Sequence, residues 1–379
     1  MQRKKIGLFF VGSYSWIGGL YYVLNIIKAL KQLPDESKPH IVLFYVNNTP
    51  KELVNAIDYP FLEKINLNRA NSFIRGSNKI LRLLFNRNFL FEYLIDRHHL
   101  SAIYPLIGFD PFLKKLKTKQ IFWIYDFQHL SLPENFTADE INRRNNSFQL
   151  MANHGRDIVF SSHVEKRHFV NLYPASNAKL HVLQFVSLIS DLTLTSEETL
   201  REKYALADKP YFLISNQFWQ HKNHRVVVEA IGLLKKHERD VLFVFTGGAD
   251  KKRPEYKAGI ENRIDQLGLT NIKMLGFITR EDQLGLMQNC LAVIQPSKYE
   301  GWGTVIEDAK ALGKGAVLSN IPIHKEQLPN NGLFFNPDDN KQLAQHLEKI
   351  IISGKALKLD VPYQKNVIDF GNQILNLFQ

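Results

Sequence analysis

The stretch whose residue types and spacing best suit chemistry is QPSKYEGWGTVIEDAKALGKGAVLSNIP, residues 295–322. Its pattern predicts a strand that ends at Ser297, a turn, a helix, and a second strand that starts at Gly315. In open parallel sheets, ligands bind outside the carboxyl ends of the strands, where helix N-termini offer N–H groups to phosphate. The turn and the helix after it are therefore a candidate site for a phosphorylated ligand.

The same turn combines small residues with carboxylates. Gly301 and Gly303 would let the backbone approach a ligand closely, while Glu300 and Asp308 place two acidic groups near one crevice. These residues outline a binding site for the donor of a group-transfer reaction. The alternative that the residues leave open is an ordinary glycine-containing turn between strand and helix, with two solvated acids.

The two neighbouring acids of the predicted helix over 304–313 are distinguished by its periodicity. At about 100° per residue, Asp308 falls on the same stripe as Val305, which we expect to face inward. Glu307 and Lys310 fall on the opposite side, which we expect to be solvated. We therefore predict that Asp308, rather than Glu307, is the second functional carboxylate.

Two further clusters lie in the first half of the chain. Gly18 and Gly19 follow a predicted first strand and open a helix, as expected where backbone comes close to a diphosphate or an acceptor. A plain flexible turn is the alternative. Asp126 and His129 follow another predicted strand, where they would orient an acceptor or relay a proton, or else hydrogen-bond only the loop backbone.

Short apolar runs alternate with helix-length amphipathic segments along the whole chain, which predicts α/β architecture with parallel sheets covered by helices. The expected strands are 5–11, 40–46, 100–106, 120–126, 157–162, 179–186, 210–216, 241–248, 271–278, 291–297, 314–320 and 332–337. The expected helices follow Gly19, cover 74–86 and 137–152, begin near His163, and cover 223–237, 255–267, 279–289, 304–313 and 339–352.

The length of 379 residues predicts two domains, because single cores rarely grow past roughly 250 residues. The chain becomes polar and turn-rich after a strand near Ser190, where we place the boundary. We predict an N-terminal domain over 1–190, a C-terminal domain over 191–360, and a closing helix within 361–379 that is free to pack back on the first domain.

Composition indicates a soluble globular protein in a reducing compartment. Hydrophobic residues make up 45% of the chain and charged residues 22%, and the single cysteine, Cys290, excludes an intrachain disulfide. The N-terminal apolar run 6–11 is shorter than the roughly 7–15 residues of an export signal. No stretch approaches the roughly 20 apolar residues of a membrane span. These features predict a cytoplasmic protein.

The net charge of +11 is concentrated in the first half. Residues 1–190 hold 24 Lys and Arg against 14 Asp and Glu, whereas residues 191–379 hold 24 against 23. Such a field favours anionic partners. Residues 78–99 interleave apolar and basic side chains, which suits peripheral contact with an anionic membrane or, alternatively, a core-packed helix with a basic solvent face. No nucleic-acid-binding motif is present, so nucleic acid is not an expected partner.

PSKYEGWGTVIEDAKALG, residues 296–313, resembles the donor-site signature of retaining glycosyltransferases of family 4. IGGLYYVLNIIKAL, IYDFQHLSLPENF and SNQFWQHKNHRVVVEAI also resemble a mannosyltransferase-like branch of that family, so the resemblance covers nearly the whole chain. It implies GT-B architecture, with two Rossmann-like, doubly wound parallel-sheet domains facing across a cleft. Residues 191–360 would then be the nucleotide-sugar donor domain and residues 1–190 the acceptor-side domain.

The resemblance also implies roles for single residues. Glu300 would hold hydroxyls of the donor sugar, and Asp308, where the family usually has Glu, would hold the ribose. Backbone amides for the diphosphate or sugar would come from Gly301, Trp302, Gly303, Thr304 and Val305. Gly18 and Gly19 would approach the donor or acceptor from the first domain.

Lys222 matches the lysine that the family directs at the diphosphate, but the family's arginine five residues earlier is Gln217 here. A neutral amide cannot neutralise a departing phosphate, so Lys222, Arg225 or helix N–H groups must do more. Many members also have a His-Asp pair where this chain has Tyr125 and Asp126, with His129 three residues later. Both departures put activity in doubt.

The resulting expectation is a retaining enzyme that moves a hexose or deoxyhexose from a nucleoside-diphosphate sugar, with GDP-mannose as first choice. Its acceptor would be a saccharide or lipid-linked saccharide in surface polysaccharide or glycan synthesis. No metal or other cofactor is expected, since the chain has no Asp-x-Asp motif. The alternatives are a catalytically inactive sugar-nucleotide or membrane-binding module, and a nucleotide-sugar epimerase or hydrolase on the same fold.

Overall fold

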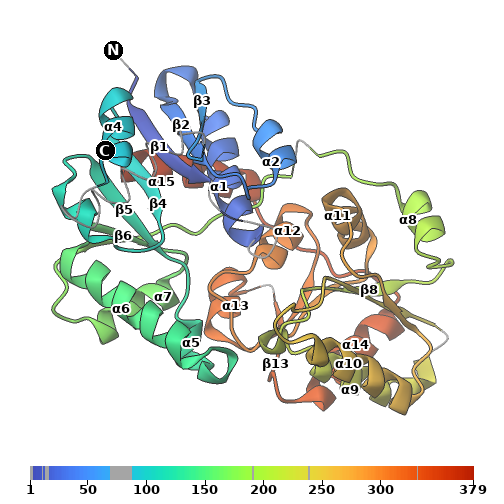
Figure 1. Cartoon of the computed structure of the whole chain (residues 1–379). Helices are drawn as coiled ribbons and strands as arrows, with labels where there is room; N and C mark the ends of the chain where they lie inside the picture. Colours follow the sequence, from blue (N-terminus) through green and yellow to red (C-terminus); the bar gives the residue numbers. More distant parts are fainter. Residues whose placement is uncertain are drawn as a thin grey trace. The chain divides into compact units, whose positions relative to one another are not determined.

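In the computed structural model the chain forms two compact α/β units (Figure 1). The first unit comprises Met1–Phe127, Thr137–Leu188 and Gln364–Gln379, and the second comprises Gln128–Phe136 and Ile189–Tyr363. The structure describes residues 3–10, 12, 17–68, 88–189, 192–237, 240–330 and 332–379. The predicted boundary at Ser190, the predicted helix over 74–86 and the first part of segment 78–99 lie outside the described residues.

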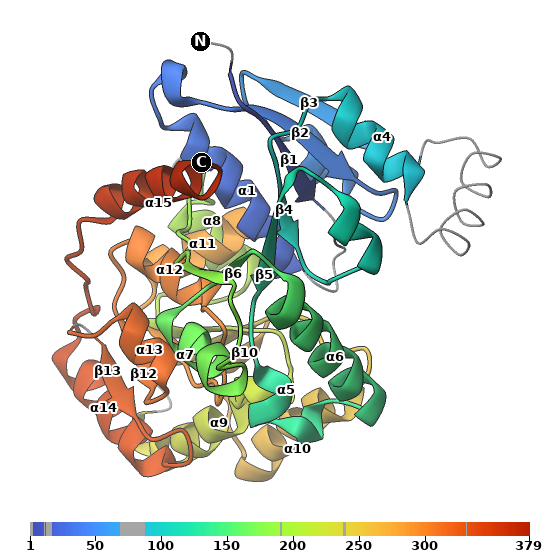
Figure 2. The same cartoon turned by 90° about the vertical axis from the view of Figure 1, so that its left-hand side faces the viewer.

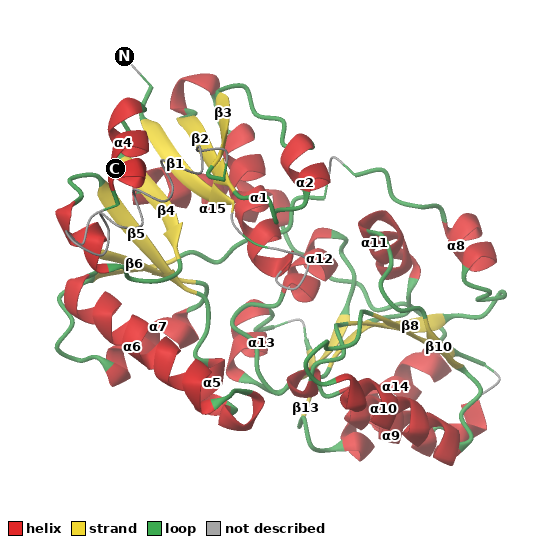
Figure 3. Ribbon diagram, in the orientation of Figure 1, coloured by secondary structure: helices red, strands yellow, loops and turns green. Residues whose placement is uncertain are grey.

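The first unit is built on one parallel sheet of seven strands in the order β3-β2-β1-β4-β5-β6-β7 (Figure 3). The strands are β1 (Lys5–Phe10), β2 (His40–Tyr45), β3 (Leu62–Asn66), β4 (Ala102–Leu106), β5 (Lys119–Ile124), β6 (Asp157–Phe160) and β7 (Lys179–Val182). Its helices are α1 (Ile17–Lys31), α2 (Lys51–Asn55), α4 (Phe89–Arg97), α6 (Ala138–His154) and α7 (His163–Leu172), with short 3-10 turns η2 (Asp35–Ser37) and η3 (Pro111–Lys115).

The C-terminal helix α15 (Tyr363–Leu377) packs against α1 in the first unit (Figure 2). The contact is close enough that a Cβ atom at Gly371 would lie 3.2 Å from the carbonyl oxygen of Ala29. At the end of the helix, Lys119 Nζ of β5 donates to the carbonyl oxygen of Leu377 at 2.9 Å. The last residues of the chain therefore belong to the first unit, although α15 begins at Tyr363, the last residue of the second.

The second unit has a six-stranded parallel sheet in the order β10-β9-β8-β11-β12-β13. The strands are β8 (Tyr211–Ser215), β9 (Leu242–Thr246), β10 (Ile272–Met274), β11 (Val293–Gln295), β12 (Ala316–Ser319) and β13 (Leu333–Phe335). Its helices are α5 (Gln128–Ser131), α8 (Glu197–Lys203), α9 (His224–Leu233), α10 (Pro254–Leu267), α11 (Arg280–Asn289), α12 (Thr304–Ala311), α13 (Pro322–Gln327) and α14 (Asn340–Ser353), with 3-10 turns η4 (Pro133–Asn135), η5 (Gln220–Lys222) and η6 (Lys235–His237).

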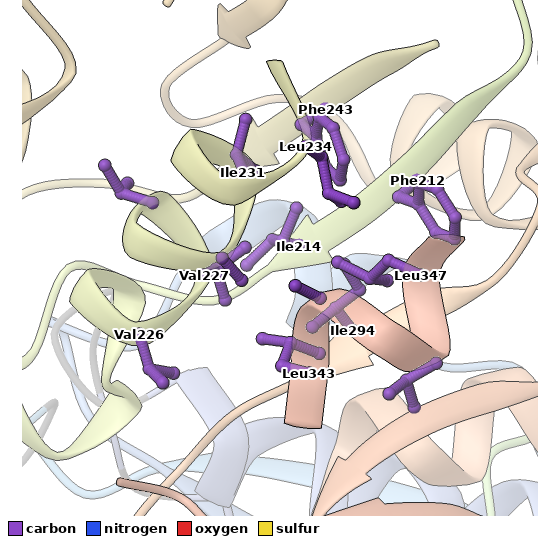
Figure 4. Close-up of a cluster of buried hydrophobic side chains, with 14 of the residues drawn as sticks. Phe212, Ile214, Val226, Val227, Ile231, Leu234, Phe243, Ile294, Leu343 and Leu347 are labelled. Atoms are coloured by element: carbon purple, nitrogen blue, oxygen red, sulfur yellow. The ribbon is translucent and has the colours of Figure 1, made fainter. Parts of the chain in front are cut away.

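The central strands β8, β9, β11 and β12 of the second sheet are buried at every position, which means that both faces of the sheet are covered there. On one face, side chains of β8, β9 and β11 pack against α9 and α14 (Figure 4), through Phe212, Ile214, Phe243, Ile294, Val227, Ile231, Leu343 and Leu347. On the other face, Tyr211 and Leu213 of β8 pack with residues of α11 and α12.

The strand order of the second sheet reverses between β8 and β11, as in a doubly wound Rossmann-like fold. Connections from these two strands leave in opposite directions, so their carboxyl ends border a crevice in which such folds bind ligands. The loops that follow Ser215 and Gln295 therefore border this crevice.

Every predicted strand is present, but β3, α2, α5 and α13 were not predicted. The sequence of β3, LEKIN, contains no continuous apolar run; β3 is an edge strand, and its charged residues are exposed. Helix α4 lies in the described part of segment 78–99; Ile95 is buried, whereas Tyr93 is 54% exposed. No helix among the described residues is long and apolar enough to cross a membrane.

Candidate functional site

The candidate site begins with an ion pair between two predicted residues. Lys222 ends the 3-10 turn η5 after β8, and Glu300 follows β11, so both lie where the strand order reverses. Lys222 Nζ is 2.7 Å from Glu300 Oε1, and the two side chains are 14% and 8% exposed. The fold thus brings together a lysine and a carboxylate that are 78 residues apart.

Two neutral amides hold the Glu300 carboxylate in place. Gln295 Nε2 donates to Glu300 Oε1 at 2.8 Å, and Asn216 Nδ2 donates to Gln295 Oε1 at 2.8 Å. All three side chains are buried. Asn216 and Gln295 were not predicted to belong to the site, although a polar residue at the end of each otherwise apolar strand was the available signal.

The charges of this cluster are set by burial and by Lys222. Burial alone would raise the pKa of Glu300, but Lys222, followed by His221 and His324, lowers it to about 2. Burial lowers the pKa of His221 to about 3 and that of His324 to about 4. Because both imidazoles are then neutral near pH 7, Lys222 is the cation that stabilises the Glu300 carboxylate at neutral pH.

The turn that carries Lys222 is fixed by its neighbour Asn223, which adopts the left-handed conformation with φ 55°. Its Nδ2 donates to the carbonyl oxygens of Pro296 at 3.1 Å and Pro337 at 2.7 Å. The backbone of Gln217, the predicted donor-binding residue of the same loop, lies close to that of Gly247. A Cβ atom at Gly247, where φ is +128°, would lie 2.1 Å from the carbonyl oxygen of Asn216, so this close approach requires glycine.

The turn at Trp302 and Gly303 leads into α12, with Gly303 as the residue before the helix and Thr304 as its first residue. Trp302 is buried, at 9% exposed. Gln327, at the end of α13, binds the Gly303 backbone twice: its Oε1 accepts from Gly303 N at 3.0 Å and its Nε2 donates to Gly303 O at 3.1 Å. Gln327 was not predicted, because α13 has too few residues to show a helical period.

Asp308 faces inward on α12, as predicted, and is 1% exposed. Its carboxylate forms an ion pair with Arg280 at the start of α11, which binds both oxygens, with Nη1 2.7 Å from Oδ2. Arg280 Nη1 also donates to Gln283 Oε1 at 2.9 Å. Arg280 was not predicted, since nothing in the spacing of α11 and α12 indicates that the two helices pack side by side.

The prediction that Glu307 and Lys310 are solvated is wrong for Glu307, which is 1% exposed, and the Lys310 side chain is only 11% exposed. Glu307 accepts hydrogen bonds from Gln327 Nε2 at 3.0 Å, Lys310 Nζ at 2.9 Å and the Tyr363 hydroxyl at 2.9 Å. The physical reason is that α13 and the start of α15 cover the side of α12 that a single-helix projection assigns to solvent.

The predicted residues of the first unit lie after the carboxyl end of a strand of its sheet and at the start of α1. Asp126 follows β5, and Arg144 of α6 binds its carboxylate and donates to its carbonyl oxygen at 3.2 Å. Gly18 and Gly19 lie in the first turn of α1. A Cβ atom at Gly18 would meet nothing within 4 Å, so the described surroundings do not require glycine there.

His129 lies in α5 and is 1% exposed, with its ring 6.2 Å from that of Phe136. Contacts place His129 in the second unit and Asp126 in the first. Although they are only three residues apart in the sequence, Asp126 and His129 therefore belong to different compact units. Among the described residues, no group of three or more His, Cys, Asp or Glu side chains is placed to hold a metal ion.

Comparison with known proteins adds a family match in the second unit. Residues 196–366 match the model of the family described as Glycosyl transferases group 1. The chain is similar to the serotype-specific mannosyltransferase WbdA of Escherichia coli, with 23% identity over 216 residues, 56% of this chain and 25% of that protein. It is also similar to O-antigen chain mannosyltransferase B of Escherichia coli, with 24% identity over 225 residues, 59% of this chain and 58% of that protein. The match thus spans about a quarter of the length of WbdA.

Two solved structures share the fold over almost the whole chain. A glycosyltransferase from Rickettsia africae ESF-5 superposes with a TM-score of 0.70 and 20% identity, covering 99% of this chain and 97% of that chain. Anabaena Alr3699/HepE in complex with UDP and glucose gives a TM-score of 0.71 and 18% identity, covering 99% of both chains. The chain therefore has GT-B architecture with two Rossmann-like α/β units, and its residues 196–366 match a group 1 glycosyl transferase domain.

Proposed function

We propose that this chain is a retaining glycosyltransferase of family 4, which transfers a hexose or deoxyhexose from a nucleoside-diphosphate sugar. The acceptor is a saccharide or lipid-linked saccharide in surface polysaccharide or glycan synthesis. The observation that carries the proposal is the buried Lys222–Glu300 pair at the point where the strand order of the second sheet reverses. The family match over residues 196–366 supports the same reading.

In this proposal Glu300 and Lys222 bind different parts of the donor, the sugar and the diphosphate respectively. Glu300, ionised because Lys222 lowers its pKa, accepts hydrogen bonds from hydroxyls of the donor sugar. Lys222 and the amides of Gly301 to Val305 stabilise the negative charge that develops on the departing diphosphate. The departing phosphate takes the acceptor proton, as the family resemblance implies, so catalysis is mainly positioning and leaving-group stabilisation.

Lys222 is better suited than Arg225 to replace the arginine that the family has at Gln217. Arg225 is 72% exposed and lies 3.6 Å from Glu229, on the outer side of α9. Lys222 is only 14% exposed beside Glu300, where a positive charge acts in a lower dielectric. We therefore assign leaving-group stabilisation to Lys222, with Gln217 restricted to hydrogen bonding.

Asp308 keeps its proposed role at the ribose, with Arg280 as the residue that holds it. A carboxylate has about four lone-pair sites. Arg280 binds one site on each oxygen, and in this proposal the carboxylate that it holds also accepts hydrogen bonds from ribose hydroxyls. The proposed roles of Asp126 and His129 are to orient the acceptor from their loop, and Gly18 and Gly19 would let the α1 backbone approach the substrates.

GDP-mannose remains our first choice of donor, and the mannosyltransferase names of two relatives support it. The complex of the similar Anabaena protein with UDP and glucose favours a uridine donor instead. A thermal-shift screen with GDP, UDP, dTDP and ADP separates these donors, because the matching nucleotide stabilises the folded state by mass action. Cytoplasmic location, peripheral membrane contact and independence of metals or other cofactors remain predictions.

The test of the proposal is product analysis by mass spectrometry, with the nucleotide sugar selected by that screen and a panel of saccharide and lipid-linked acceptors. We expect transfer to an acceptor and a loss of about 100-fold or more in Glu300→Gln and Lys222→Met. Donor hydrolysis or epimerisation that needs no acceptor would instead identify the related enzyme classes. Donor binding without turnover would identify an inactive binding module, to which the departures at Gln217 and Tyr125 point.

A further inference from the structure

A continuous chain of hydrogen bonds runs behind the proposed donor turn, on the side of α12 away from Asp308. It starts at the Gly303 backbone, which Gln327 binds through both its amide oxygen and its amide nitrogen. A Cβ atom at Gly303 would lie 3.0 Å from Gln327 Oε1, so the glycine is also what lets the amide approach. Gln327 is 4% exposed, and its position is therefore fixed by packing as well as by these bonds.

Glu307 is the centre of this chain. The same Gln327 Nε2 that binds Gly303 donates to Glu307 Oε1 at 3.0 Å, and Lys310 Nζ approaches that oxygen at 2.9 Å. The other oxygen, Oε2, accepts from the Tyr363 hydroxyl at 2.9 Å. A buried carboxylate with three partners on three elements holds those elements in one arrangement, because an unmade bond to it would be costly.

Lys310 provides a second connection between the same two ends. Its Nζ lies 6.0 Å from the centre of the Trp302 ring and 5.8 Å from the centre of the Tyr363 ring. Both distances are within the range of cation–π attraction. The turn residues Trp302 and Gly303 are thus each linked to Tyr363, one through Lys310 and the other through Gln327 and Glu307.

The far end of both connections is the residue at which the chain leaves the second unit. Contacts assign Ile189–Tyr363 to the second unit and Gln364–Gln379 to the first. Tyr363 is also the first residue of α15. The hydroxyl that binds Glu307 therefore belongs to the last residue before the chain joins the first unit.

We propose that Gln327, Glu307 and Tyr363 are positioning residues that set the backbone of the donor turn at Trp302 and Gly303. Through them, the shape of the turn depends on where the crossover residue Tyr363 is held. The inference rests on the proposed function in one respect, namely that the ligand of this turn is the nucleotide-sugar donor. None of the three side chains needs to touch the donor for this role.

The first measurement needs no ligand and is therefore independent of the proposed function. Hydrogen–deuterium exchange of the full chain should show faster exchange of the amides of 301–305 in Tyr363→Phe and in Gln327→Ala, by about fivefold or more. The matched control is Tyr204→Phe, which removes a tyrosine–carboxylate bond of the same kind in the same unit, from Tyr204 to Asp282 at 2.6 Å. Exchange of 301–305 in this control should stay at the wild-type rate.

Tyr363→Phe keeps the ring and removes one hydroxyl, so it tests the connection without a large change in packing. Unchanged exchange of 301–305 in Tyr363→Phe, or an equal increase in Tyr204→Phe, would overturn the inference. A chain-wide increase in Gln327→Ala would report unfolding, and the comparison of the two tyrosine variants then decides. Exchange that rises at 301–305 in Tyr363→Phe, with the rest of the second unit unchanged, supports it.

The second measurement is kinetic and separates positioning from chemistry. Loss of one hydrogen bond to a charged group corresponds to about a tenfold change, so we expect Tyr363→Phe to raise the donor KM about tenfold while the acceptor KM is unchanged. Equal changes in the two KM values would contradict a role in the donor turn. If the wild-type chain neither binds nor transfers a sugar, the proposed function fails, whereas the exchange experiment still tests the connection.

Discussion

Replacing Lys222 with methionine removes the cation beside Glu300 while keeping a side chain of similar length. Glu300 is 8% exposed and would retain its hydrogen bond from Gln295, at 2.8 Å, but no longer a compensating charge. A buried carboxylate in this position is costly because it has lost the water that would otherwise solvate it. The variant therefore measures how much of the donor site's structure depends on the ion pair.

The magnitude follows from the pKa of Glu300. Its environment, in which burial opposes Lys222 and two imidazoles, lowers that pKa from 4.5 to about 2. By linkage this corresponds to at most about 3–4 kcal/mol, since one pKa unit is about 1.4 kcal/mol and the imidazoles contribute only when protonated. Breaking a buried pair typically costs about 3–5 kcal/mol. We expect Lys222→Met to lower the free energy of unfolding by about 2–3 kcal/mol near pH 7.

The loss of stability in Lys222→Met should depend on pH, and the Glu300 pKa in each protein decides in which direction. In the wild type, the contribution of Glu300 is present above its unfolded-state pKa of 4.5 and is lost as the pH falls towards about 2. In Lys222→Met burial dominates, so the Glu300 pKa lies above its ordinary value and the carboxyl takes up a proton as the pH falls. The difference between variant and wild type should therefore shrink between about pH 7 and about pH 5.

Urea unfolding at these two pH values, with two controls, provides the assay. Lys298→Met removes an exposed pair, with Lys298 41% and Asp338 72% exposed, and should cost less than about 1 kcal/mol. The double variant Lys222→Met with Glu300→Gln removes both charges and should recover most of the lost stability, but not donor binding. The reasoning would be refuted by a loss in Lys222→Met that is no larger than in Lys298→Met and is the same at both pH values.

Four further predictions concern the ligands and the thiol. Asp308→Asn should weaken donor binding by about 10- to 100-fold in calorimetry, because it loses charge-assisted hydrogen bonds, and unchanged affinity would remove Asp308 from the site. Transfer should survive EDTA; loss in chelator that manganese or magnesium restores would show a metal requirement. Binding to anionic vesicles should weaken as salt rises, whereas equal, salt-insensitive binding to neutral vesicles would refute an electrostatic membrane contact. Burial raises the pKa of Cys290 to about 12, so a thiol reagent should modify it only after unfolding, and rapid modification of the folded chain would contradict that burial.

The strands were predictable because each buried parallel strand is a short, continuous apolar run. β8, with the sequence YFLIS, and β9, with LFVFT, are buried at every position. Strand β3 lacks this signal because it lies at the edge of its sheet and exposes Glu63 and Lys64. Its existence follows from pairing with β2, which is information that its own residues do not carry.

The Lys222–Glu300 contact was predictable in outline, since motif resemblance and strand ends placed both residues at the same edge of one sheet. The neutral side chains around it were not. Asn216, Gln295 and Gln327 hold the charged groups or the turn, yet an amide at the end of a strand or helix looks like any other polar residue. Their importance comes from which atoms they meet, and that depends on the packing of the whole unit.

Helix α12 shows where periodicity stops being sufficient. The projection correctly placed Asp308 inward, because the sheet is the partner against which an apolar stripe must pack. It failed for Glu307, because a helix of Rossmann-like folds has a solvent face only where no later element covers it, and α13 and Tyr363 do so here. A charged residue on that face then becomes a buried hub instead of a solvated acid. The two adjacent acids consequently differ in what they hold: Asp308 is fixed by Arg280 from α11, whereas Glu307 joins the donor turn to the end of the unit. Sequence patterns identify the acids, but the elements that close over α12 decide which protein groups each of them meets.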